Sequence, residues 1–157
     1  MKTAIMEKLD AFNISYTIKP HERAVYTSED AARERGVCLS QIVKTMLLTN
    51  SEGDVVATVI PGDRKLDFKK LKKLTGLKSL SFMKRKSVEE KLGLVVGAIS
   101  PLGEIFQKIP VFVDPGVFAE PLVDISSGDP NAGLELKRED LRRLLNDATI
   151  EEIAKKE

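Results

Sequence analysis

Residues 40–49 (Ser-Gln-Ile-Val-Lys-Thr-Met-Leu-Leu-Thr) constrain the fold most, because they have the pattern of a buried strand and yet contain a lysine. Side chains alternate between the two faces of a strand, so Lys44 shares its face with Ile42, Met46 and Leu48. Moving an ammonium group out of water is costly unless an anion or a set of carbonyl groups receives it. Two interpretations remain open: Lys44 reaches water over an apolar stem, or it holds an anionic or carbonyl-bearing ligand in a pocket.

The composition excludes several classes of protein. A chain of 157 residues is long enough to bury its own core, and we expect a single domain over residues 1–157. No apolar run approaches the roughly 20 residues that span a bilayer, and residues 1–10 lack a signal-peptide core, so we expect a cytoplasmic protein without membrane contact. With one cysteine, Cys38, and one histidine, His21, we expect no disulfide, no metal site and no cofactor.

The net charge of +1 hides a strongly basic segment. Residues 64–91 contain eleven lysine and arginine residues against three acidic ones, a net charge of +8 that leaves −7 for the rest of the chain. A basic block in an otherwise acidic molecule favours a polyanionic partner. The alternative is a helix whose lysines simply face water.

Hydrophobic periodicity and turn residues predict a mixed α/β fold. Helices are expected over residues 3–12, 28–36, 67–76, 87–93, 137–145 and 150–156. Strands are expected over residues 14–18, 40–49, 55–60, 80–82, 111–114, 122–126 and 134–136. Residues 40–49 and 55–60 should pair as a hairpin across the turn 50–54, residues 19–23 should form a loop, and Ser87 should open its helix with a capping box.

No familiar catalytic constellation is present. A Ser-His-Asp or Cys-His arrangement would have to use His21, which lies in the predicted loop, and the glycines match no phosphate-binding loop. What remains is Lys44, the turn 97–103 and the turn 126–129. Gly97 lets a ligand approach the backbone, and Ser100 before Pro101 is held extended, so nearby N–H groups can point into a cavity and bind an oxyanion. The alternative is a strand that ends in a proline turn.

In combination, five motifs resemble the YbaK/EbsC family of free-standing aminoacyl-tRNA deacylases, which are similar to the editing domain inserted in bacterial prolyl-tRNA synthetases. They are Val-Lys-Thr-Met-Leu-Leu (43–48), Val-Ile-Pro-Gly-Asp (59–63), Leu-Asp-Phe-Lys-Lys-Leu (66–71), Val-Gly-Ala-Ile-Ser-Pro-Leu-Gly (96–103) and Ser-Ser-Gly-Asp (126–129). The resemblance implies a curved, mixed β-sheet surrounded by helices. It also implies hydrolysis of the ester that joins a mischarged amino acid to the 3′-terminal adenosine of tRNA.

The resemblance also implies site residues. Lys44 matches the essential lysine of the family and is the expected catalytic residue. The expected substrate-binding residues are His21, Tyr26, Met46, Gly97, Ile99, Ser100, Pro101, Gly128 and Asp129. Apart from the resemblance, the basic segment 64–91 is the expected tRNA surface, and its expected tRNA-binding residues are Lys69, Lys70, Lys72 and Lys73.

Two departures from the family pattern bear on specificity. His21-Glu22-Arg23 stands where cysteine-specific members carry Tyr-Glu-His, and Val96 replaces the first of two glycines, which narrows the pocket. We expect a tight, apolar pocket for tRNA-Pro that carries a small amino acid such as cysteine or alanine, with proline rejected. The expected partners are tRNA and an aminoacyl-tRNA synthetase. The alternatives are a non-catalytic module that docks on a synthetase or on RNA, and a hydrolase of another small acyl or nucleotide substrate.

Overall fold

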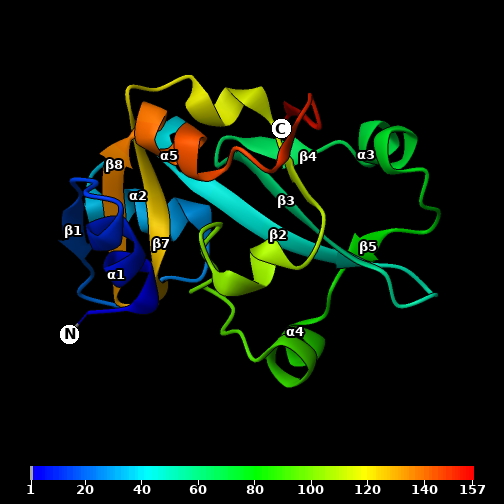
Figure 1. Ribbon diagram of the computed structural model, residues 1–157, viewed down its shortest axis with the longest axis horizontal. Helices are drawn as coiled ribbons and strands as arrows, with labels where there is room; N and C mark the ends of the chain where they lie inside the picture. Colours follow the sequence, from blue (N-terminus) through cyan, green and yellow to red (C-terminus); the bar gives the residue numbers. More distant parts are fainter. Residues whose placement is uncertain (1) are drawn as a thin grey trace.

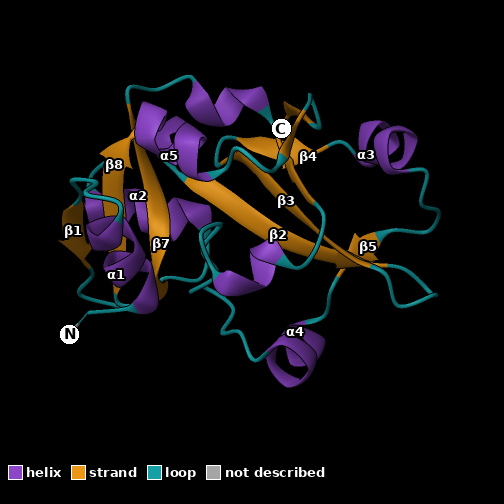
Figure 2. Ribbon diagram, viewed as in Figure 1, coloured by secondary structure: helices purple, strands orange, loops and turns teal. Residues whose placement is uncertain are grey.

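The computed structural model describes residues 2–157 and arranges ten strands in three ladders (Figures 1 and 2). The largest ladder has the order β5-β2-β3-β6-β9, with bounds β2 (Val43–Thr49), β3 (Val55–Pro61), β5 (Ser81–Phe82), β6 (Val111–Val113) and β9 (Thr149–Ile150). The second has the order β1-β8-β7, with bounds β1 (Thr17–Pro20), β7 (Leu122–Asp129) and β8 (Ala132–Lys137). The third pairs β4 (Arg64–Leu66) with β10 (Ala154–Lys156).

The five-stranded ladder is mixed, as the family resemblance implies, and the other two ladders are antiparallel. The hairpin β2–β3 is antiparallel with the register Lys44↔Ile60, whereas β6 lies parallel to both β3 and β9. A parallel bridge between Ile42 and Asp124 joins the start of β2 to β7, so the three-stranded ladder continues the five-stranded one around a bend. This bend brings residues far apart in the sequence to one place beside β2.

Helices pack around these ladders, and polar caps and glycines set most of their ends. Their bounds are α1 (Ala4–Ala11), α2 (Ser28–Arg35), α3 (Phe68–Thr75), α4 (Arg85–Leu92) and α5 (Arg138–Leu144). Short 3₁₀ helices lie at η1 (Leu39–Gln41), η2 (Glu104–Gln107) and η3 (Pro115–Phe118). The Thr27 hydroxyl and the Asp67 carboxylate accept hydrogen bonds from the first turns of α2 and α3, and Gly36 and Gly76 end these helices in the left-handed conformation. The predicted bounds of both helices are therefore confirmed to within one residue.

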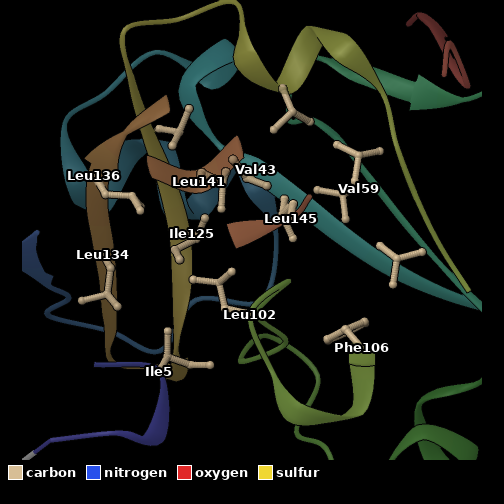
Figure 3. Close-up of a cluster of buried hydrophobic side chains, with 14 of the residues drawn as sticks. Ile5, Val43, Val59, Leu102, Phe106, Ile125, Leu134, Leu136, Leu141 and Leu145 are labelled. Atoms are coloured by element: carbon tan, nitrogen blue, oxygen red, sulfur yellow. The ribbon is translucent and has the colours of Figure 1, made fainter. Parts of the chain in front are cut away.

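Strand β2 is buried on both faces. Val43 and Leu47 pack with Val59, Ile125 and other residues in the main core, part of which is drawn in Figure 3 between β2, β7, β8 and α5. Leu48 packs on the opposite face in a second cluster with Ile60, Leu66, Leu71 and Ile153. Lys44 and Met46 are half-buried on that second face.

Pro20 is the first departure from the predicted elements. It lies in β1 opposite Ala132, although residues 19–23 were predicted to be a loop, and the strand begins at Thr17 rather than at residue 14. Strand β1 is at the edge of its ladder, where a residue without an N–H group is tolerated.

The predicted helix over residues 150–156 is wrong, since this segment forms the end of β9 and β10. The Asp114 carboxylate accepts hydrogen bonds from the backbone N–H groups of Ile153 (2.9 Å) and Ala154 (3.0 Å), and the carbonyl of Ile153 accepts one from Asp67 N (2.7 Å). Ile153 is fully buried. These long-range hydrogen bonds satisfy the polar backbone groups of the extended segment. They outweigh the preference of Glu-Glu-Ile-Ala-Lys-Lys for a helix.

The predicted capping box at Ser87 is also wrong. Helix α4 begins at Arg85, two residues earlier, so Ser87 lies inside its first turn. The N–H group of Met83 donates to the carbonyl of Leu47 (2.9 Å), which extends the β5 contact with β2 and leaves the chain free to turn into the helix directly afterwards. Gly93 ends the helix as predicted.

Candidate functional site

A cavity of about 350 Å³ lies beside the first half of β2. Its walls come from the segment that leads into α2, from β2, from the segment before Ser100 and from β7. The lining residues are 25–29, Ala31, Arg35, 42–46, Val96, Gly97, Ile99 and Ser126. Apolar side chains and charged or hydroxyl groups are therefore mixed in this lining, which differs from the uniformly apolar pocket expected from the sequence.

The cavity lies where β2 has no strand partner on one side among the described residues, between the bridge of Ile42 to Asp124 and the pairing with β5. The N–H group of Gly62 donates to the carbonyl of Ile42 (2.8 Å), so the even-numbered residues of β2 direct their backbone groups toward β3. Odd-numbered residues face the other side, where β5 pairs with Leu48 and Thr49 and Met83 reaches Leu47. The backbone N–H and carbonyl groups of Thr45 consequently face the cavity.

Lys44 lies on the cavity wall, and its ammonium group donates a hydrogen bond to a backbone carbonyl group. Its Nζ atom donates a hydrogen bond to the backbone oxygen of Arg64 at 2.8 Å, and the residue is half-buried. An ammonium group has three N–H donors, so two remain for a ligand. The stem lies on the face of Met46 and Leu48, and the ammonium group has a carbonyl partner beside the cavity.

Gly97 is required by close packing. Its φ of +95° is disfavoured for other residues, and a Cβ atom there would lie 2.5 Å from the carbonyl oxygen of Val25 and 2.7 Å from Cδ1 of Tyr26. The space that we expected a ligand to use is thus filled by the loop before α2. The guanidinium group of Arg85 lies over the Tyr26 ring, 5.4 Å from its centroid. This cation–π contact joins α4 to a residue that lines the cavity.

The structure brings five of the predicted site residues together and places the other predicted substrate-binding residues elsewhere. Lys44, Tyr26, Met46, Gly97 and Ile99 line the cavity. Pro101 lines a second cavity of about 470 Å³, and Ser100 and Gly128 line a third of about 240 Å³. Ser100 is buried, and its hydroxyl oxygen accepts a hydrogen bond from Leu102 N (3.4 Å).

His21 and Asp129 belong to the neighbouring turn structure. The His21 ring bonds through Nδ1 to the carbonyl of Pro130 (2.9 Å), and the Asp129 carboxylate accepts a hydrogen bond from Asn131 N (2.9 Å) in the β7–β8 turn.

The predicted tRNA-binding lysines lie on one helix, α3. Lys69, Lys70, Lys72 and Lys73 are all exposed, while Leu71 on the opposite side is fully buried in the second cluster. Figure 1 shows α3 next to β4. The first residue of β4 is Arg64, whose backbone carbonyl accepts the hydrogen bond from Lys44. The basic helix is therefore connected to the cavity through a short stretch of chain.

A cluster of charged residues beside the cavity was not predicted. Arg35 lines the cavity, and its Nε atom donates to Nε2 of His21 at 3.0 Å. Asp124 is fully buried, and the Gln41 side-chain amide donates both to it (3.0 Å) and to Glu135 (3.1 Å). Burial, and then the neighbouring Glu135, raise the pKa of Asp124 to about 7.

One sequence signal for this cluster was available. Asp124 lies between Val123 and Ile125 in a predicted strand, which is the same anomaly that marked Lys44. Nothing local to the sequence indicates that Arg35 reaches the same region, because the helix α2 approaches β7 and β8 only in the folded chain.

Two further features bear on function. No group of three or more histidine, cysteine, aspartate or glutamate residues within residues 2–157 is arranged to hold a metal ion. Over the same residues, every helix is too short or too polar to cross a membrane.

Comparison with known proteins places the chain in a family. The family described as "Aminoacyl-tRNA editing domain" matches residues 22–144. The prolyl-tRNA editing protein ProX of Acetoanaerobium sticklandii is 30% identical over 148 residues, which cover 92% of this chain and 90% of ProX. EbsC of Enterococcus faecalis, whose name gives Cys-tRNA(Pro)/Cys-tRNA(Cys) deacylase as a provisional activity, is 28% identical over 92% of this chain and 89% of its own length.

A solved structure agrees with these relationships. The crystal structure of a hypothetical protein superposes with a TM-score of 0.82 and 27% identity, and covers 96% of this chain and 99% of its own. The mixed α/β architecture, the lysine of β2 on the cavity wall and the sequence matches over most of the chain lead to one conclusion: the chain belongs to the aminoacyl-tRNA editing domain family.

Proposed function

We propose that this chain is a deacylase that acts in trans on mischarged tRNA, with Lys44 as its catalytic residue. The observation that carries the proposal is the place of Lys44: its ammonium group lies on the wall of a cavity shared with Gly97, and it keeps two N–H donors for a ligand. Membership of the editing family and the names of ProX and EbsC support the substrate class.

The chemistry requires no strong base from the protein. An aminoacyl ester is already activated, so positioning and stabilisation of the developing oxyanion supply much of the acceleration. Lys44 would bind the phosphate of the terminal adenosine or polarise the ester carbonyl. The backbone N–H group of Thr45 at the open edge of β2 is a further donor for the oxyanion. The ribose 2′-hydroxyl would orient the attacking water, or the thiol of a cysteinyl group would attack its own ester.

The finer specificity that we propose is tRNA-Pro carrying a small amino acid such as cysteine or alanine. A cavity of about 350 Å³ is at the lower end of the range for ligand pockets, which suits an aminoacyl group with part of the ribose. Val96 and Ile99 line the cavity, and apolar lining side chains exclude larger amino acids by size. His21 would affect this site indirectly. Its ring accepts a hydrogen bond from Arg35, which lines the cavity, and so positions the arginine side chain.

The same proposal covers the partners. Lys69, Lys70, Lys72 and Lys73 would hold the acceptor end of tRNA, because exposed lysines gathered on one short helix can contact successive phosphates. A synthetase would deliver the mischarged tRNA to this protein. Residues 1–157 would act as one domain. The protein would work in the cytoplasm, because tRNA is aminoacylated there. Ser100, Pro101, Gly128 and Asp129 would support the site through the second and third cavities and the β7–β8 turn.

A panel of mischarged tRNAs tests the proposal directly. The parent protein should release cysteine or alanine from tRNA-Pro within minutes, and Lys44→Ala should not. The competing function is a docking module on a synthetase or on RNA, which would bind tRNA equally well with or without Lys44 and would release no amino acid. Absence of hydrolysis of every aminoacyl-tRNA, with intact tRNA binding, would favour that alternative.

A further inference from the structure

We propose that Arg35 is an oxyanion-binding residue of the cavity beside β2, held in position by His21 and by packing against Gly133. This inference deepens the proposed function, and it rests on that function only for the identity of the substrate. The cavity is then lined by two cationic side chains, Lys44 and Arg35. Of these, only Lys44 was predicted from the sequence.

The guanidinium group of Arg35 is fixed by contacts from two other segments. Its Nε atom donates to Nε2 of His21 at 3.0 Å, and Nδ1 of the same ring bonds to the carbonyl of Pro130 at 2.9 Å. These partners assign the proton to Nδ1, because Nε2 must accept from Arg35. A Cβ atom at Gly133 in β8 would overlap Cζ, Nε and Nη2 of Arg35, so the guanidinium lies flat against backbone that only glycine leaves open.

The outer edge of the guanidinium remains free for a ligand. Among residues 2–157, no hydrogen bond or ion pair involves either Nη atom of Arg35, and neither atom is fully buried. Two Nη atoms carry four N–H donors in a fixed planar fork. Because Arg35 lines the cavity and its Nε side is occupied by His21, this fork is the part of the residue that a ligand in the cavity can reach.

The carboxyl groups behind Arg35 do not cancel its charge. The titratable neighbours on the packed elements are Asp124 on β7, Glu135 on β8, Lys19 on β1 and His21 before α2. Glu135 already has an ion pair with Lys19 at 3.5 Å and a hydrogen bond from Gln41. The Oδ1 atom of Asp124 is buried without a partner among residues 2–157, and burial raises the pKa of this carboxyl group to about 7. Near neutral pH much of Asp124 is protonated, and the cavity keeps the positive charge of Arg35.

A planar fork with four free donors fits an oxyanion best. Arginine binds carboxylate and phosphate groups in a bidentate manner, and a partly desolvated guanidinium does so more strongly than one in bulk water. Burial lowers the pKa of Arg35, and the nearby Asp124 opposes this effect, so the residue stays charged. In the substrate the oxyanion is either a phosphate near the 3′ end of the tRNA or the carboxylate of an acidic aminoacyl side chain.

The first experiment measures anion binding without any tRNA. Inorganic phosphate and acetate are titrated into the parent protein, Arg35→Met, Arg35→Lys and the control Arg33→Met by calorimetry. Arg33 is on the same helix but is exposed and paired with Asp30. We expect phosphate affinity to fall at least tenfold in Arg35→Met, to fall less in Arg35→Lys, and to stay unchanged in Arg33→Met. Equal phosphate affinity in the parent and in Arg35→Met, with both folded by circular dichroism, overturns the proposal.

The second experiment separates the two sources of the oxyanion. If Arg35 binds a tRNA phosphate, Arg35→Met raises KM for every aminoacyl-tRNA that the parent hydrolyses and changes kcat little. If it binds a side-chain carboxylate, acetate rather than phosphate is the stronger probe, and the loss is confined to aspartyl-tRNA and glutamyl-tRNA. Unchanged kinetics for all substrates overturns the proposal. If the parent hydrolyses no aminoacyl-tRNA, the proposed function fails, while the phosphate titration still decides the role of Arg35.

Discussion

The ammonium nitrogen of Lys44 and the carbonyl oxygen of Arg64 lie 2.8 Å apart, so the lysine of the cavity is hydrogen-bonded to the first residue of the basic segment 64–91. Strand β4, which begins at Arg64, leads directly into the lysine-rich helix α3. A single hydrogen bond thus connects the proposed catalytic group to the proposed tRNA surface, and a tRNA held by α3 would lie next to Lys44.

Replacing Lys44 by alanine should reduce kcat/KM for deacylation at least a hundredfold with little loss of stability. The residue is half-buried and its one protein partner is a carbonyl near the surface, so its removal strands no buried charge. Deacylation rates and thermal unfolding by circular dichroism check this, with the exposed Lys108→Ala as control. Turnover near that of the parent, or an unfolded variant, contradicts the prediction.

Changing Lys69, Lys70, Lys72 and Lys73 together to glutamate should raise KM for aminoacyl-tRNA with a smaller effect on kcat. Phosphate contacts release counterions, and binding should weaken with salt by a logarithmic slope of about −0.7 to −0.9 per contact. Comparing this slope between the parent and the variant gives the number of phosphates that α3 binds. The matched control reverses Lys137 and Arg143, which are exposed on the distant segment around α5. If the α3 variant and the control bind tRNA alike, the tRNA surface is elsewhere.

Replacing Gly97 by alanine should destabilise the protein by roughly 1 to 3 kcal/mol beyond the effect of the backbone conformation alone. The new methyl group would press on Val25 and Tyr26. Gly53→Ala is the control, because Gly53 has a similar φ of +83° but a Cβ atom there would meet no other atom within 4 Å. Urea unfolding of both variants isolates the contribution of close packing, and equal losses of stability would show that the contact with Tyr26 is not tight.

Replacing Asp124 by asparagine should flatten the dependence of stability on pH. The pKa of Asp124 is raised to about 7 in the folded state, so between about pH 4 and pH 7 the native protein binds more protons than the unfolded chain. The stability of the parent therefore falls as the pH rises through this window and levels off above it. The asparagine variant avoids this loss and should gain on the order of 2 kcal/mol relative to the parent between about pH 4.5 and pH 8.

Urea unfolding at several pH values measures this difference. The control is Asp63→Asn, which removes an exposed carboxylate between β3 and β4. Parallel pH profiles for the parent and Asp124→Asn would show that Asp124 is ionised in the folded protein at all of these pH values.

Replacing Val96 by glycine should widen the cavity and shift deacylation toward larger amino acids. Val96 lines the cavity, and apolar lining side chains select by size with modest discrimination among amino acids of similar volume. Rates for alanyl-, cysteinyl-, seryl-, threonyl- and prolyl-tRNA with both proteins give the profile. Fast hydrolysis of prolyl-tRNA by the parent, or an unchanged profile in the variant, would place the amino-acid pocket elsewhere.

The sequence by itself determined the elements whose signals are local. The apolar stretches over residues 43–49 and 55–60 on either side of a polar turn predict the hairpin, and Asp67 with Gly76 predicts the ends of α3. The anomaly of a lysine in an apolar strand pointed to Lys44, and the order of the motifs pointed to the family. Each of these inferences depends on residues that are neighbours along the chain.

Tertiary structure alone decided the features that depend on partners distant in the sequence. Residues 150–156 are extended because the carboxylate of Asp114 binds their backbone, and no local pattern reports such a partner. The turn 97–103 separates Gly97 from Ser100 and Pro101, which line different cavities, because the loop before α2 packs on the glycine. Arg35 reaches the cavity because the bend between β7 and β2 places the end of α2 against Gly133 of β8. The charge of a side chain is visible in the sequence, but its burial and its neighbours are set only when the chain folds.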